Sequence, residues 1–123
     1  MTSPSANGQT WVYLDIPRAL EQVGDEQALQ NMMPMLEEML ERDLPLISQS
    51  LANGDVRGAN PLLHSLKGCL PIFCEQTLCA HLAQVEQLSK AGSSAEVSTA
   101  YAALAPKLLG LQQEVTQYLS ARA

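Results

Sequence analysis

Three residues in the middle of the chain have the types and spacing to carry chemistry together. His64, Lys67 and Gly68 lie within the run HSLKG. A neutral imidazole nitrogen is a nucleophile near neutral pH. If it attacks a phosphoryl group, the product carries new negative charge, which a lysine one turn away can offset. A glycine leaves the space beside the ring open, at a cost of about 1 kcal/mol in helix propensity relative to alanine.

The helical turn of about 100° per residue separates this set from the core. His64 lies about 130° from the centre of an apolar stripe, on an outward side that it shares with Pro61, Ser65 and Gly68. Lys67 falls between the two sides, within reach of the ring. We therefore expect the ring to stand on the surface of the protein. The stripe that faces the core comprises Ala59, Leu63, Leu66 and Leu70.

Apolar residues recur at spacings of three and four along most of the chain, and no segment alternates as a strand would. The resulting stripes comprise Leu29, Met33, Leu36, Leu40, Leu44, Ile47 and Leu51 in the second helix, Leu78, Leu82, Val85 and Leu88 in the fourth, and Val97, Tyr101, Leu104, Leu108, Leu111, Val115 and Tyr118 in the fifth. Pro34 and Pro45 should interrupt and bend the second helix, and Pro106 and Gly110 should bend or loosen the last. Five helices are expected. The first, second, fourth and fifth should span about residues 15–23, 26–52, 75–91 and 95–121. The third should begin between Gly58 and Pro61, with Asn60 as one candidate cap, and end at about Phe73.

This pattern predicts an all-α fold. Four amphipathic helices joined by short loops favour an antiparallel up-down-up-down four-helix bundle, with a short extra N-terminal helix over one end. The polar start of the chain predicts a flexible tail over residues 1–12, followed by one bundle domain over residues 13–121.

The net charge and composition of the chain limit the kinds of partner that it can bind. The chain has 123 residues and a formal net charge of −6, which argues against nucleic acid and against an anionic membrane surface. No apolar run approaches the roughly 20 residues that span a bilayer, and no signal peptide is recognisable. Three cysteines cannot all pair within one chain, so we expect free thiols and a cytoplasmic location.

Cys69, Cys74 and Cys79 recur every five residues, and His81 follows them. A zinc site is one alternative, but steps of five rotate about 140° on a helix, so the thiols do not share a face. Buried small apolar residues are the better interpretation, and no metal site is expected. His81, at the flank of an apolar stripe, is expected to be partly buried and structural.

In this setting the HSLKG run closely resembles the histidine phosphotransfer (HPt) family, whose hallmark is His-x-Leu-Lys-Gly. The segments LDIPRALEQVGDEQAL and SLANGDVRGANPLLHSLKG resemble the opening helix and the second loop of that family. The resemblance covers about residues 13–120. The segment CLPIFC departs from it, because Pro71 lies within it and Cys74 stands where the family often has glycine.

The resemblance implies that His64 accepts the phosphoryl group, that Lys67 assists it and that Gly68 leaves room. It also implies a monomeric phosphocarrier rather than an enzyme, relaying phosphoryl groups between aspartates of response-regulator receiver domains, including those of hybrid sensor histidine kinases. The receiver would bring Mg²⁺, and the carrier would hold no cofactor of its own. Pro61, Ser65 and Pro71 would line the contact with the receiver.

Two other functions stay open at this point. The chain could be the acceptor helix pair of a sensor kinase, but Ser65 stands where that class has an acidic residue, and no nucleotide-binding segment follows. It could also be a four-helix-bundle adaptor that binds a response regulator or sensor kinase without phosphotransfer. The intact His-Lys-Gly set argues against the adaptor, and the altered CLPIFC segment leaves it open.

Overall fold

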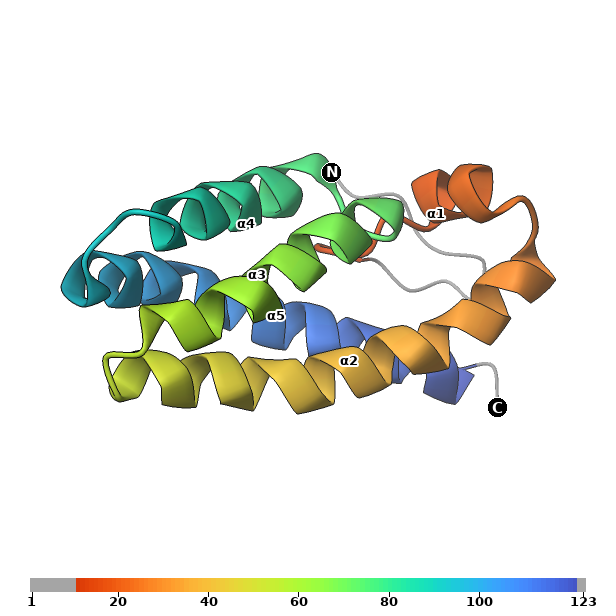
Figure 1. Cartoon of the computed structure of the whole chain (residues 1–123). Coiled ribbons are helices and arrows are strands. Elements are labelled where there is room, and N and C mark those ends of the chain that lie inside the picture. Colours follow the sequence, from red (N-terminus) through yellow and green to blue (C-terminus); the bar gives the residue numbers. More distant parts are fainter. Residues whose placement is uncertain (1–10, 122–123) are drawn as a thin grey trace.

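The computed structural model describes residues 11–121 (Figure 1). This part is helical, as the sequence predicts, and its only extended pairing is a single antiparallel bridge between Leu14 and Cys74. In chain order the elements are α1 (Ile16–Val23), α2 (Glu26–Ala52), α3 (Val56–Cys69), the 3-10 turn η1 (Leu70–Ile72), α4 (Gln76–Ser89) and α5 (Ser94–Ala121).

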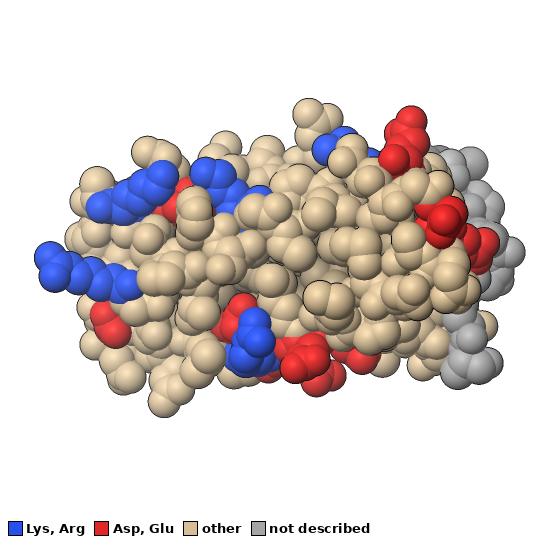
Figure 2. Space-filling model, turned by 45° about the vertical axis from the view of Figure 1, so that its right-hand side comes forward, with Lys and Arg blue, Asp and Glu red and all other residues tan. Residues whose placement is uncertain are grey.

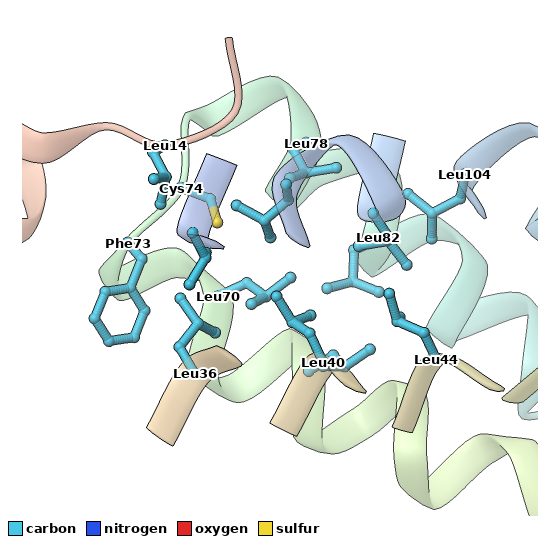
Figure 3. Packing of buried hydrophobic residues seen from close by; sticks show 14 of the residues in the cluster. Leu14, Leu36, Leu40, Leu44, Leu70, Phe73, Cys74, Leu78, Leu82 and Leu104 are labelled. Carbon is cyan, nitrogen blue, oxygen red and sulfur yellow. The ribbon is translucent and has the colours of Figure 1, made fainter. Parts of the chain in front are cut away.

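The four longer helices enclose one core. α2 packs against α3 and α5, and α4 packs against the same two helices. The short α1 contacts α2 and η1 and so covers one end of this bundle (Figure 1). Leucine side chains dominate the interior, where Leu40 and Leu44 of α2 lie opposite Leu82 of α4 and Leu104 of α5 (Figure 3).

The inward stripes predicted for α2, α3 and α5 are all confirmed. Every residue assigned to these stripes is buried, which stabilises the fold by roughly 1.5–3 kcal/mol for each large side chain. In α4, Leu78, Leu82 and Val85 are buried and Leu88 is partly buried. The buried stripe of α5, for example, comprises Val97, Tyr101, Leu104, Leu108, Leu111, Val115 and Tyr118.

α3 begins earlier than predicted. Asp55, not Asn60, is its N-cap, and the Asp55 side chain accepts a hydrogen bond from the Gly58 N–H at 2.9 Å. A capping aspartate satisfies one of the N–H groups that the first turn leaves without a partner. The side chain of Asn60 instead donates to Ser89 Oγ at 2.7 Å and so links α3 to α4.

Pro71 ends α3 before the predicted limit near Phe73. Proline has no N–H, so it cannot donate to the carbonyl of Lys67 four residues earlier. The α-helix stops at Cys69, and the turn η1 follows, with the N–H groups of Phe73 and Cys74 both donating to Leu70 O at 2.9 Å. The chain thereby turns from α3 into α4 directly after the HSLKG run.

The other prolines do not interrupt their helices. α2 runs through Pro34 and Pro45, and α5 runs through Pro106. All three are exposed, so water can serve the carbonyls that lose a donor. Gly110 does not loosen α5 either: a Cβ there would lie 2.5 Å from Cε2 of Tyr13, so the glycine permits close approach of the N-terminal segment.

That N-terminal segment is fixed across α5. Residues 1–10 of the predicted tail lie outside the described residues, but Trp11 is buried. The N–H groups of Val12, Tyr13 and Leu14 all donate to the carboxylate of Glu114, at 2.8, 3.0 and 2.9 Å. The folded domain therefore begins no later than Trp11, ahead of the predicted boundary at residue 13.

We expect Glu114→Ala to lower the free energy of unfolding by about 2 kcal/mol, because three backbone donors lose a charged acceptor. Urea denaturation followed by circular dichroism measures this change. Gln113→Ala, at the exposed neighbouring position, is the matched control and should change little. Equal stabilities of the two variants would contradict this account of the N-terminal segment.

Candidate functional site

His64 projects from the surface of α3, as its helical position predicts. Its side chain is 69% exposed. Pro61, Ser65 and Gly68 are exposed on the same helix, so the structure brings these four residues together on one open side. Pro71 lies apart from them in η1, where it is half-buried and its carbonyl accepts from Arg18 Nε at 2.9 Å.

The fold itself gives no reason for glycine at position 68. A Cβ there would meet nothing within 4 Å. Among the described glycines only Gly24 and Gly54 have a positive φ, so the backbone of Gly68 does not require glycine either. Glycine within a helix costs stability relative to alanine. Open space beside His64 is what the glycine provides.

Glu86 of α4 lies beneath this surface and contacts three basic groups. Its side chain has no exposed area, and its Oε1 is 3.2 Å from Lys67 Nζ. Its Oε2 is 3.4 Å from His64 Nδ1 and 3.7 Å from Lys90 Nζ. His64 and Lys90 thus lie at ion-pair distance from Oε2, but neither donates a short hydrogen bond to it. We call His64, Lys67, Glu86 and Lys90 the Glu86 cluster.

Glu86 is charged despite its burial. Burial alone would raise the pKa of this carboxyl, but the hydrogen bond and charge of Lys67, the charge of Lys90 and the contact with His64 together hold its pKa below the ordinary value. Its cover consists of long cationic side chains and a ring rather than apolar core, so the charged form is well compensated.

The carboxylate near Nδ1 favours one of the two neutral forms of the His64 ring. A neutral imidazole carries one proton, and Glu86 Oε2 favours that proton on Nδ1. The lone pair then resides on Nε2. The exposed ring can therefore present an unprotonated nitrogen to a phosphoryl donor.

Our sequence reasoning missed Glu86. It assigned Leu78, Leu82, Val85 and Leu88 to the inner face of α4 and gave Glu86 no role. Two signals were present, because Glu86 follows Leu82 by four residues and precedes Lys90 by four. The first spacing places it beside the apolar stripe, and the second predicts an ion pair along the helix.

The cysteines do not form a second site. Cys69 and Cys79 are half-buried and Cys74 is buried, all as free thiols. Burial raises the pKa of each thiol, most strongly that of Cys74, which makes them poor nucleophiles. Within residues 11–121 no group of three or more His, Cys, Asp and Glu side chains could hold a metal ion.

His81, the second histidine, is partly buried as predicted. Its Nδ1 lies 3.0 Å from Lys107 Nζ, which can donate to it. Partial desolvation and the charge of Lys107 both lower the pKa of His81. The ring is thus held neutral in a contact between α4 and α5.

An apolar groove of about 320 Å³ lies between α2 and the end of α3. Methionines supply much of its lining, and Met35 is 69% exposed. Figure 2 shows a broad uncharged area on one face of the molecule, with Lys, Arg, Asp and Glu side chains mainly around its edges. Surfaces of this kind suit protein partners. Residues lining the groove include Met32, Met35, Met39, Arg42, Cys69 and Phe73.

None of the helices in the described part is both long enough and apolar enough to cross a membrane. In comparisons with protein-family models, curated proteins and solved structures, the chain has no match. The geometry around His64 and the residues of the HSLKG run are therefore what a functional proposal can rest on.

Proposed function

We propose that this chain is a phosphocarrier of the histidine phosphotransfer type, built as an antiparallel up-down-up-down bundle. His64 accepts a phosphoryl group from an aspartyl phosphate of a response-regulator receiver domain and passes it to another. The observation that carries this proposal is the combination at one surface: a nucleophile 69% exposed, a cation beside it, and a glycine that the fold does not require.

The transfer step follows from the tautomer. The lone pair of Nε2 attacks phosphorus in line with the acyl oxygen of the receiver aspartate. The P–O bond breaks, its electron pair leaves with the aspartate carboxylate, and a P–N bond forms. The ring then carries a positive charge, with its proton still on Nδ1 against Glu86 Oε2. In onward transfer a carboxylate oxygen of another receiver's aspartate attacks phosphorus, a P–O bond forms, the P–N bond breaks, and the neutral ring leaves.

Charge compensation falls to the residues of the Glu86 cluster. Glu86 stabilises the positive ring that forms when Nε2 is phosphorylated. The ammonium of Lys67, now 3.2 Å from Glu86 Oε1, is one helical turn from His64 and can turn to the phosphoryl oxygens. Phosphoryl transfer depends mainly on positioning and neutralisation, so the receiver with its Mg²⁺ supplies the remaining groups.

The partner in this proposal is a receiver domain, either separate or within a hybrid sensor kinase. Pro61 and Ser65 lie exposed beside His64 and would border the contact, and Pro71 would mark its limit near η1. The apolar groove near Cys69 and the uncharged face in Figure 2 support a protein partner. We further propose that the carrier acts as a monomer in the cytoplasm, where receivers and free thiols occur together.

A transfer screen tests the proposal. Each receiver domain of the host is phosphorylated with ³²P and mixed with the purified chain, and the label on each protein is followed over time. We expect label to move to this chain from at least one receiver within minutes. The bond formed should be labile in acid and stable in base, as a phosphoramidate is.

Two results would contradict the phosphocarrier. Label that stays on every receiver would remove the transfer function. If a receiver then still bound the chain, with an affinity unchanged by His64→Ala, the chain would be an adaptor that binds without transfer. Incorporation of label directly from ATP would instead indicate a kinase component.

A further inference from the structure

The Glu86 cluster contains one more cation than the proposed transfer uses. Lys90 follows Glu86 by one helical turn on α4, and its Nζ is 3.7 Å from Glu86 Oε2. Its side chain is 47% exposed, so it lies at the rim of the cluster rather than inside it. Lys67 approaches the other carboxylate oxygen, from α3. Each oxygen of Glu86 therefore has its own lysine.

Phosphorylation of His64 would change which negative charges these two lysines compensate. In the unphosphorylated chain Lys67 compensates Glu86, at 3.2 Å. A phosphoryl group on Nε2 brings up to two negative charges to the outer side of the ring. If Lys67 turns to this group, Glu86 loses its nearest cation at the moment when another anion arrives. The positive charge of the ring is then shared between the phosphoryl group and Glu86, so a second cation beside Glu86 favours the transfer.

We propose that Lys90 is a positioning residue, which keeps Glu86 paired and in place against His64 Nδ1 while Lys67 serves the phosphoryl group. This inference rests on the proposed function. Lys90 and the ring share Oε2, so the lysine stays beside the oxygen that holds the ring proton.

The experiment compares Lys90→Met with Lys107→Met. Both variants remove one positive charge and leave a side chain of similar length, but Lys107 contacts His81 and not Glu86. Phosphoramidate is the donor, so receiver docking plays no part: its P–N bond breaks, ammonia leaves, and phosphorus joins Nε2. Phosphorylation of each protein is followed by ³¹P NMR. We expect Lys90→Met to react about fivefold more slowly than Lys107→Met.

Three further readouts separate positioning from a general effect on folding. Lys90→Arg should restore the rate to within about twofold, because a second cation again reaches Oε2. Raising the salt to about 0.5 M should narrow the gap between the two methionine variants, because an exposed ion pair is screened. In the unphosphorylated protein, ¹³C NMR should show that Lys90→Met raises the pKa of Glu86, since Lys90 is one of the groups that lower it.

The outcomes distinguish the two proposals. If wild type is phosphorylated and the two methionine variants react at the same rate, the role of Lys90 is overturned and the phosphocarrier stands. If Lys90→Arg is as slow as Lys90→Met, charge is not what Lys90 supplies, and the proposal is also overturned. If wild type takes up no phosphoryl group from either phosphoramidate or receivers, the proposed function itself fails.

Discussion

His64→Gln is expected to take up no label from any phosphorylated receiver, whereas wild type is labelled within minutes. Glutamine keeps a polar side chain of similar reach but has no nucleophilic nitrogen, because its amide lone pair is delocalised. The side chain at position 64 is 69% exposed, so the substitution disturbs no core packing. The measurement is transfer of ³²P from a receiver, resolved by gel electrophoresis.

The chain provides its own control in the other histidine. His81→Gln removes a ring that is partly buried and paired with Lys107, away from the Glu86 cluster. We expect this variant to be labelled as fast as wild type. Label on His64→Gln, or loss of label in both variants, would contradict the assignment of His64 as the acceptor.

Gly68→Gln should separate stability from transfer. The new side chain finds open space, because a Cβ at position 68 meets nothing within 4 Å. Replacing glycine within a helix should raise the free energy of unfolding by about 0.5–1 kcal/mol. Transfer from a receiver should fall about 100-fold, because a displacement of about 1 Å from the in-line geometry costs that much. Urea denaturation and label transfer measure the two effects.

The same variant carries an internal control. Phosphoramidate is small enough to pass a glutamine side chain, so Gly68→Gln should react with it within about twofold of wild type. Gly68→Ala should lie between glycine and glutamine in receiver transfer and match glutamine in stability. If Gly68→Gln accepts label from a receiver at the wild-type rate, the open space is not what the glycine provides for the partner.

Local patterns were sufficient for the helices and for the outward direction of the His64 side chain. Every apolar residue that the spacing of three and four assigned to the stripes of α2 and α5 is buried, because a long amphipathic helix has one way to bury its apolar stripe. The same geometry predicted the exposure of His64. The helix limits around the site were less accurate, because they depend on single capping side chains such as Asp55.

Contacts between distant segments could not be predicted in this way. Gly110 looked like a weak point of α5, but Tyr13, almost a hundred residues earlier, lies against it. Glu114 has no distinguishing sequence pattern, yet it accepts three hydrogen bonds from the N-terminal segment. Glu86 belongs with these, since its partners His64 and Lys67 come from another helix.

The central claim is that Nε2 of His64 is the free nucleophile because Glu86 holds the proton on Nδ1. The most direct measurement is ³¹P–¹⁵N correlation NMR on the phosphorylated protein with labelled histidine. The account predicts one signal that joins phosphorus to Nε2 of His64, with Nδ1 still protonated. Phosphorus on Nδ1, on His81 or on an oxygen of any side chain would contradict it.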